Sequence, residues 1–220
     1  MNNDKPLGEK LSAGGSAYGI TLDDRTIGRF VRYDRLVREW NPRMNLISRG
    51  DLGRFAEYHL LDSLKVASCF DFRGVRRLID FGSGAGLPGI PIALAFPHIA
   101  ISLVDSRKKR CIFLEAAVRE LGLGQAAVFC GRLEHLDFSF DGSCDAVTSR
   151  GTVSLERFFT SSARFLAPGG SLIAIKGDRI DDELESLSSA VDRSVFNISH
   201  THPVPVPGVR TGQVILVTKC

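Results

Sequence analysis

The chain has 220 residues, of which 44% are hydrophobic and 24% are charged. This is an ordinary globular composition, which excludes a disordered chain or a coiled coil. The net charge is only +3, well short of a strongly basic nucleic-acid-binding protein. No apolar run reaches the ~20 residues that span a bilayer, and residues 1–10 lack the apolar core of a signal peptide. We therefore expect a cytoplasmic protein without a membrane partner.

Three segments precede the first predicted strand. Residues 1–20, rich in Gly, Ser and Ala, are typical of a mobile N-terminal segment. Residues 21–74 are predicted to form a helical extension, with an amphipathic helix over 21–41 and a second helical stretch over 51–70. The outer face of the first helix is a candidate for binding RNA phosphates, although a face of mixed charge is also typical of plain solvent exposure. Its arginines are Arg25, Arg29, Arg32, Arg35 and Arg38.

From residue 75 to residue 220, predicted strands alternate with predicted helices, which indicates an α/β domain with a mostly parallel sheet. The last two strands are joined by a short proline-rich link without a helix, so we expect them to pair antiparallel. Ligands of such sheets bind at the carboxyl ends of the strands. The predicted strands cover 75–81, 100–105, 126–130, 145–149, 171–176, 194–199 and 213–218, and the predicted helices 88–96, 108–121, 155–166 and 180–191.

A glycine-rich turn follows the first of these strands and contains Gly82, Gly84, Gly86 and Gly89. Glycine lets the backbone turn sharply and approach a ligand closely, and the next helix directs its first N–H groups at the same place. The spacing fits both the dinucleotide fingerprint and the pattern used for S-adenosylmethionine, so the turn alone does not choose. Asp105 ends the second strand. A carboxylate there can accept hydrogen bonds from ribose hydroxyls or cap the next helix.

Three further polar residues follow later strands. Glu134 comes after the third, where a carboxylate suits an adenine amino group but is also typical of a solvated loop. Arg150 comes at the end of the fourth, and an arginine there can grip a carboxylate, a phosphate or the acceptor edge of guanine. Lys176 ends the fifth strand and is a candidate for contact with RNA. An ion pair for Arg150 and simple solvation for Lys176 are the structural alternatives.

Seven short motifs occur in order along the chain. They are Asn45-Leu-Ile-Ser48, Glu57-Tyr-His-Leu-Leu-Asp-Ser63, Phe81-Gly-Ser-Gly-Ala-Gly-Leu-Pro-Gly89, Leu103-Val-Asp-Ser106 with Lys109-Arg110, Arg119-Glu-Leu-Gly-Leu123, Thr148-Ser-Arg150 and Ala174-Ile-Lys-Gly177. Together they resemble the RsmG (GidB) family of class I S-adenosylmethionine-dependent methyltransferases, from about residue 21 to the end. The family more often has alanine where this chain has Gly151, which keeps the site small.

The resemblance implies a Rossmann-like sheet and methylation of guanine N7 in bacterial 16S ribosomal RNA, in the 530-loop region. It implies S-adenosyl-L-methionine as cofactor and 16S rRNA or the small ribosomal subunit as partner. Gly82 and Leu87 would line the methionine and adenosine side, while Leu133 and Glu134 would hold adenine. Arg150 would lie against the cofactor near the reacting centre. His59 and Asp62 would lie at the rim of the cleft and position RNA or the first loop, although a hydrogen-bonded pair on a helix surface fits their spacing equally well. We expect a monomer.

Guanine N7 carries a lone pair and no proton, so its methylation is an in-line displacement without a general base. We therefore assign Arg150 to orientation of substrate or cofactor and not to acid–base catalysis. The five cysteines lack C-x-x-C spacing, and we expect no metal site.

Two other function classes fit parts of the sequence. A nicotinamide-dependent oxidoreductase would use Gly84, Gly86, Gly89 and Asp105, but it leaves Glu134 without a role. A module that binds S-adenosylmethionine or RNA without turnover would also keep the glycine turn. Titration with S-adenosylmethionine and NAD separates the first alternative, and methyl transfer to RNA separates the second.

Overall fold

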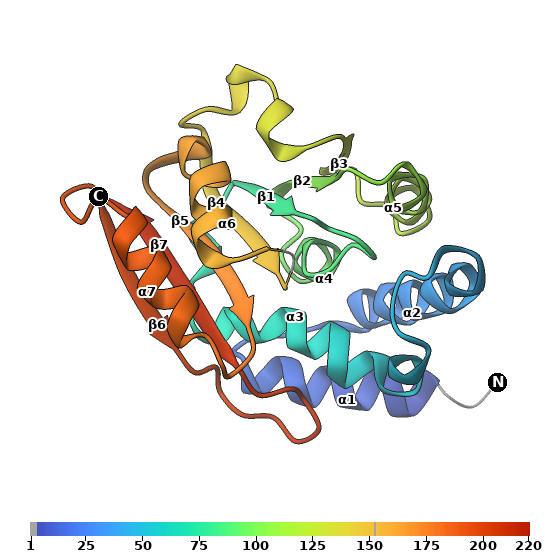
Figure 1. Ribbon diagram of the computed structural model, residues 1–220. Helices are drawn as coiled ribbons and strands as arrows, with labels where there is room; N and C mark the ends of the chain where they lie inside the picture. The colour runs from blue at the N-terminus through green and yellow to red at the C-terminus, as the bar shows by residue number, and fades with distance from the viewer. Residues whose placement is uncertain (1–3, 152) are drawn as a thin grey trace.

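The computed structural model describes residues 4–151 and 153–220. Seven strands among them form one sheet in the order β3-β2-β1-β4-β5-β7-β6, with helices on both faces (Figure 1). The alternation of strands and helices predicted from residue 75 onward is confirmed. The strands are β1 (Arg77–Phe81), β2 (Ala100–Asp105), β3 (Ala126–Cys130), β4 (Cys144–Arg150), β5 (Leu166–Lys176), β6 (Phe196–Thr201) and β7 (Gln213–Lys219).

The first five strands pair parallel, and β7 runs antiparallel to both β5 and β6. The predicted antiparallel closing pair is therefore confirmed. Phe81 at the end of β1 is aligned with Val104 of β2 and with Ser149 of β4. This register brings the carboxyl ends of the central strands to one edge of the sheet, where the polar residues expected to form the site follow them.

Each face of the sheet has its own hydrophobic core. The α4 and α5 face packs against the N-terminal helices, and its core includes Tyr33, Leu60 and Leu103. The opposite face, with α6 and α7, has a core that includes Phe158 and Leu172. The helices of the domain are α4 (Gly89–Ala95), α5 (Lys108–Glu120), α6 (Leu155–Ser162) and α7 (Asp181–Ala190), with short turns η5 (Leu133–His135), η6 (Phe138–Phe140) and η7 (Ala163–Phe165).

The N-terminal segment differs from the expectation of a mobile start. Residues Asp4–Ala17 form helix α1, and Leu11 in it is fully buried. A Cβ atom on Gly14 would lie 2.6 Å from Leu61 Cδ2, so this glycine lets α1 approach the extension closely. The small residues that suggested mobility are there because the helix packs tightly. Residues 1–3 lie outside the described part of the chain.

The helical extension is more irregular than predicted. Its first helix, α2 (Asp24–Met44), is capped by the Asp23 side chain and continues through Pro42 instead of ending at residue 41. The stretch predicted as helical over 51–70 is helical in the structure, but it is divided into short pieces. These are η1 (Arg49–Arg54), η2 (Ala56–Leu61), α3 (Asp62–Leu64) and η3 (Lys65–Ser68), followed by η4 (Phe72–Gly74).

Candidate active site

The glycine-rich turn joins β1 to α4 at the carboxyl edge of the sheet. Gly82, Gly84 and Gly86 have φ angles of 72°, 58° and 88°, in the left-handed region that other residues disfavour. A Cβ atom on Gly84 would lie 3.2 Å from the Arg110 guanidinium. The backbone conformation therefore requires glycine here, and it leaves the main chain open to a ligand.

Two adjoining cavities lie along this edge and share Gly82, Arg107 and Arg110. One, of about 250 Å³, lies over the ends of β1, β2 and β3. The other, of about 350 Å³, lies between the glycine turn and the end of β4, where Leu87 and Arg150 line it. Two connected lobes of this kind fit a nucleoside joined to an amino-acid tail, which is the shape of S-adenosylmethionine.

Asp105 stands at the end of β2 and is almost fully buried at the wall of the first cavity. Its carboxylate oxygens accept hydrogen bonds from the backbone N–H groups of Gly84 and Arg107, each with an N···O distance of 2.9 Å. Arg110 Nη1 lies 3.5 Å away. A carboxylate has about four lone-pair positions, so Asp105 can hold the glycine turn and still accept a ribose hydroxyl.

Leu133 and Glu134 follow β3, and both line the first cavity. Leu133 is buried, whereas Glu134 is exposed and accepts the Ser161 hydroxyl at 3.2 Å. A backbone N–H, Ser161 and the nearby Arg157 and Arg132 lower the pKa of Glu134. The structure therefore places an ionised hydrogen-bond acceptor at the wall of the first cavity.

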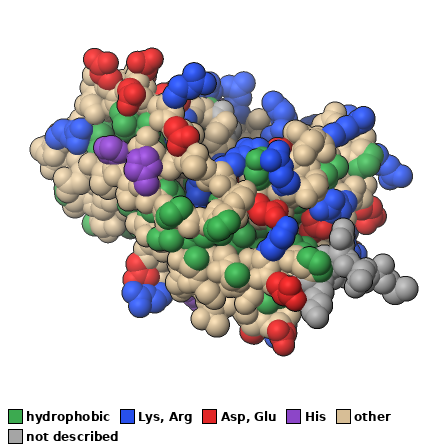
Figure 2. Space-filling model, turned by 90° about the horizontal axis from the view of Figure 1, so that it is seen from below, with side chains coloured by type: hydrophobic (Ala, Val, Ile, Leu, Met, Phe, Trp, Pro, Cys, Tyr) green, Lys and Arg blue, Asp and Glu red, His purple; other side chains and the backbone are tan. Residues whose placement is uncertain are grey.

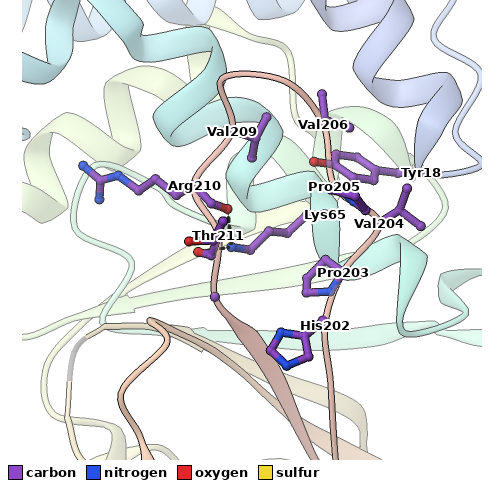
Figure 3. Close-up of a pocket in the computed structure, with 11 residues that line it drawn as sticks. Tyr18, Lys65, His202, Pro203, Val204, Pro205, Val206, Val209, Arg210 and Thr211 are labelled. Carbon is purple, nitrogen blue, oxygen red and sulfur yellow. Dashed lines mark hydrogen bonds between the residues drawn. The ribbon is translucent and has the colours of Figure 1, made fainter.

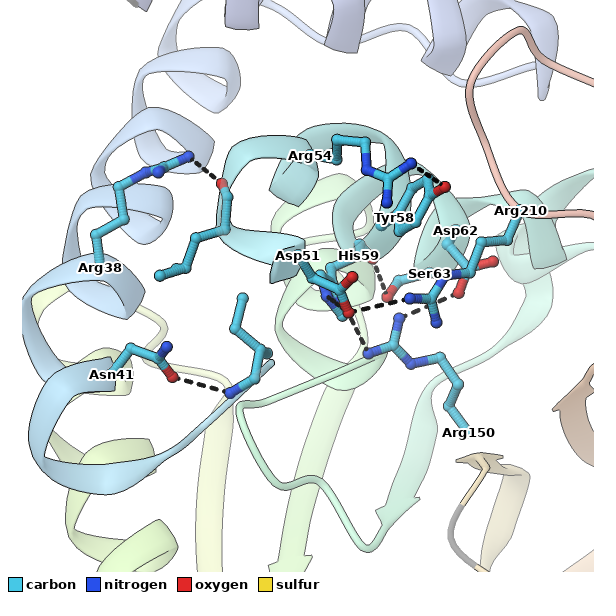
Figure 4. A network of polar contacts seen from close by, with 12 residues as sticks. Arg38, Asn41, Asp51, Arg54, Tyr58, His59, Asp62, Ser63, Arg150 and Arg210 are labelled. Atoms are coloured by element: carbon cyan, nitrogen blue, oxygen red, sulfur yellow. Dashed lines mark hydrogen bonds and ion pairs between the residues drawn. The ribbon is translucent and has the colours of Figure 1, made fainter. Parts of the chain in front are cut away.

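Arg150 ends β4 and connects the sheet to the helical extension (Figure 4). Its Nη1 donates to Asp62 Oδ2 at 3.1 Å, and its Nη2 lies 3.1 Å from His59 Nδ1. Asp62 is buried and pairs with Lys65 Nζ at 2.8 Å. Because Arg150 also lines the second cavity, the extension fixes the position of a cation at the wall of the candidate site.

His59 is held as a neutral ring. Its Nδ1 faces a guanidinium group, which only donates hydrogen bonds, so Nδ1 is the acceptor and the proton lies on Nε2. Nε2 lies 3.4 Å from Asp51 Oδ2. Burial, and then the charge of Arg150, lower the pKa of His59 to about 4. His59 is therefore a buried neutral group beside Arg150 that lines the second cavity, and its role in positioning RNA stays a prediction.

Two buried groups beneath the glycine turn were not predicted from the sequence to belong to the site. Asp80 is fully buried, accepts the Gly89 N–H at 3.1 Å, and has no partner for Oδ1 within residues 4–151 and 153–220. Burial raises the pKa of Asp80 to about 7. Tyr33 donates its hydroxyl to Ala85 O at 2.5 Å. An acid inside an apolar strand was a usable signal for Asp80, whereas Tyr33 fits the core face of α2 and gave none.

The remaining expected RNA-binding residues lie away from the two cavities. The five arginines of α2 line neither of them. Lys176 Nζ contacts Val153 O at 2.6 Å and Glu183 Oε2 at 2.7 Å, and only 10% of its side chain is exposed. Lys176 thus fastens the loop after β4 to α7, and its contact with RNA stays a prediction.

A third cavity, of about 270 Å³, lies between the extension and the loop that joins β6 to β7 (Figure 3). Tyr18 and the proline-rich loop form much of its wall. Lys65 Nζ reaches Arg210 O at 3.3 Å and Thr211 O at 3.5 Å. Since Lys65 also pairs with Asp62, this lysine links the loop to the polar network around Arg150.

No group of three His, Cys, Asp or Glu side chains with the geometry of a metal site occurs in the described residues. Within the same residues, no helix combines the length and the apolar character needed to cross a membrane.

The sequence matches the family described as rRNA small subunit methyltransferase G (GidB) over residues 26–205. The chain belongs to this family. A Ribosomal RNA small subunit methyltransferase G from Azoarcus sp. (strain BH72) is 35% identical over 212 residues, which cover 96% of each chain. The protein of the same name from Chlorobaculum tepidum is 36% identical, covering 84% of this chain and 82% of its own.

Solved structures agree on the fold. A tRNA (m1A58) methyltransferase from Aquifex aeolicus is similar with a TM-score of 0.53 at 12% identity, covering 66% of this chain and 62% of its own. Family and fold together make this an S-adenosylmethionine-dependent methyltransferase of small-subunit ribosomal RNA. They exclude the nicotinamide-dependent alternative and the module without turnover.

Proposed function

We propose that this chain methylates N7 of a guanine in bacterial 16S ribosomal RNA, in the 530-loop region, and that it acts in the cytoplasm as a monomer. Family membership supports a small-subunit ribosomal RNA substrate. The choice of N7 and of the 530 loop rests on the resemblance read from the motifs. The observation that carries the proposal is the pair of cavities between the glycine turn and Arg150.

The residues present fit S-adenosylmethionine. The glycine turn would lie against its methionine part, Asp105 would accept the ribose hydroxyls, and Glu134 would accept the adenine amino group. When bound, this cofactor supplies an electrophilic methyl group on a sulfonium sulfur. The proposed contacts are Gly82, Gly84, Gly86, Leu87, Asp105, Leu133, Glu134 and Arg150.

Methylation of N7 requires alignment of the guanine with the methyl group and no removal of a proton. N7 offers a lone pair and no proton, so proximity and alignment supply most of the rate. Two ionisable groups at the site are committed to internal hydrogen bonds, since Asp105 accepts backbone N–H groups and His59 accepts from Arg150. This commitment supports a site that positions the reactants.

Arg150 is the proposed orienting residue. Methylation brings a positive charge to the purine, so a freely moving cation beside N7 would oppose the reaction. Asp62 and His59 hold the guanidinium group in place and direct its donors. In this position it can grip guanine O6, an RNA phosphate or the methionine carboxylate, and we propose that it binds one of these.

Transfer of labelled methyl from S-adenosylmethionine to 30S particles that lack the modification, followed by nucleoside analysis, tests the proposal. We expect the label in 7-methylguanosine from 16S RNA, and none in particles that already carry the modification. Label in a different nucleoside would contradict N7. Label in 7-methylguanosine outside the 530 loop would contradict the position alone.

A further inference from the structure

Three exposed arginines, Arg107, Arg132 and Arg157, line the first cavity; we call them the cationic rim. Within residues 4–151 and 153–220, no acidic side chain pairs with them, and their guanidinium groups donate no hydrogen bond. Glu134 and Asp105 line the same cavity, and Arg157 and Arg132 help to lower the pKa of Glu134. The rim thus places guanidinium donors without partners at the opening of the candidate active site.

Three arginines of α2, by contrast, already bind groups within the molecule. Arg29 donates to Leu121 O at 2.7 Å and 2.9 Å. Arg32 pairs with Glu120 at 2.8 Å. Arg38 pairs with Asp34 at 2.7 Å, and its Nη2 donates to Leu52 O at the same distance. Binding a phosphate would break these contacts, which lowers the net gain from each arginine.

Both regions carry exposed arginines. Figure 2 shows basic side chains over much of one face of the molecule, around a hollow near its centre and toward its right edge. The two surfaces therefore differ in whether their guanidinium groups already have hydrogen-bond or ion-pair partners. This difference distinguishes them better than the number of arginines does.

We propose that the phosphates on either side of the target guanine bind to the cationic rim, and that the outer face of α2 does not hold the RNA backbone. This inference rests on the proposed function. The target guanine must reach the cofactor methyl group beside Arg150 in the second cavity, and Arg107 of the rim lines both cavities. Base and phosphate belong to one nucleotide, so a guanine placed there brings its own phosphates close to the rim. Guanidinium groups bind phosphate by paired, charge-assisted hydrogen bonds.

The same geometry specifies the conformation of the RNA. In an A-form helix, N7 faces a deep and narrow major groove that protein side chains do not enter. The guanine must therefore be unpaired or turned out of the helix to reach the cavities. The partner at the rim is a single-stranded segment or a loop, and a complementary oligonucleotide annealed over it should block methyl transfer.

Two double variants with the same change in net charge test the rim. Arg132→Ala with Arg157→Ala removes two rim cations, and Arg25→Ala with Arg32→Ala removes two exposed cations from α2. The probe is a 16S rRNA transcript, with binding measured over a range of salt concentrations. For the rim variant we expect affinity to fall about tenfold or more, and the slope of log affinity against log salt to fall by about 1 to 2. The α2 variant should stay within about twofold of the unmodified protein.

The affinity for S-adenosylmethionine, measured by calorimetry without RNA, is the second readout. We expect it to stay within about twofold in the α2 variant, and to fall by much less than the RNA affinity in the rim variant, whose two arginines also line the first cavity. A rim variant that loses cofactor affinity but keeps RNA affinity would overturn the inference and assign the rim to the cofactor. Loss of RNA binding in the α2 variant alone would return the RNA to α2.

The two assays distinguish a wrong assignment of the rim from a wrong assignment of the methylated nucleoside. If the unmodified protein forms 7-methylguanosine in 16S RNA and the rim variant binds RNA normally, only the inference fails. If the unmodified protein modifies another nucleoside while the rim variant loses RNA binding, only the proposed acceptor atom fails. A protein that neither binds nor methylates the RNA would overturn both.

Discussion

Asp80 is a carboxyl group enclosed beneath the glycine turn, and burial raises its pKa to about 7. An unfolded aspartate has a pKa of about 3.9. Between these two values the folded protein keeps a proton that the unfolded chain releases, so the free energy of unfolding falls as pH rises through this window. The Ser83 side chain, the backbone N–H of Gly89 and the charge of Arg150 favour the ionised form but do not outweigh the burial.

We predict that Asp80→Asn stabilises the cofactor-free protein more at pH 8 than at pH 4.5, by on the order of 1–3 kcal/mol. Asparagine keeps an oxygen for the Gly89 N–H and has no charge to bury. Urea denaturation at the two pH values measures the difference, and the contribution of His59 cancels because both proteins contain it. Asp71→Asn, at an exposed site where Arg73 lowers the pKa, should show no such gain. Equal effects at both pH values would contradict the prediction.

Arg150 contacts two buried side chains, Asp62 and His59. Two replacements test its geometry and its charge separately. We predict that Arg150→Lys, which cannot reproduce the forked contact with Asp62 and His59, lowers kcat for RNA methylation by on the order of 100-fold, an orientation effect. In Arg150→Ala the pKa of His59 should rise above its value of about 4, since the Arg150 charge helps to lower it. NMR titration of the ring measures this shift. An unchanged pKa with reduced activity would place Arg150 away from His59.

At the scale of elements, helix α1 depends on glycines that allow close contact. We predict that Gly14→Ala destabilises the protein by about 1–3 kcal/mol, because the added methyl group meets Leu61 at 2.6 Å. Gly28→Ala in α2 is the matched control, because nothing lies within 4 Å of its added methyl group. That change should stabilise the protein by about 0.5–1 kcal/mol. Chemical denaturation of both variants checks the pair, and a neutral Gly14→Ala would mean that α1 is not packed as described.

The features that could be predicted from the sequence are those that depend on interactions between residues close together in the chain. The strands from residue 75 onward were predicted to within a few residues, except that β5 starts earlier, at Leu166, because hydrophobic pattern and turn residues are local signals. The glycine turn and the strand-end residues Asp105 and Glu134 were found for the same reason. The contact of Arg150 with His59 and Asp62 joins residues about 90 positions apart. Such contacts, and the packing of α1, exist only once the chain has folded.

At the scale of the whole molecule, the extension and the sheet share one hydrophobic core. Phe30, Tyr33 and Leu60 from the extension are fully buried in the same cluster as Ile90 and Leu103 from the sheet domain. The change of character at residue 75 therefore marks a change of secondary structure within one core. A fragment covering 75–220 would expose these apolar contacts to water, and we expect it to aggregate or to bind hydrophobic dyes.

The single tryptophan allows a direct test of whether the extension and the sheet domain unfold together. Trp40 lies on α2 with its ring centroid 5.8 Å from that of Phe113 on α5, so its fluorescence reports on the contact between the extension and the domain. Circular dichroism reports on helices and strands throughout the molecule. We predict that the two signals change together on urea denaturation, with the same midpoint and slope, because a shared core unfolds cooperatively. A fluorescence midpoint at lower urea would show that the extension separates first. In that case the contacts around Arg150 would be lost before the sheet unfolds, and methyl transfer would fall along with the fluorescence signal.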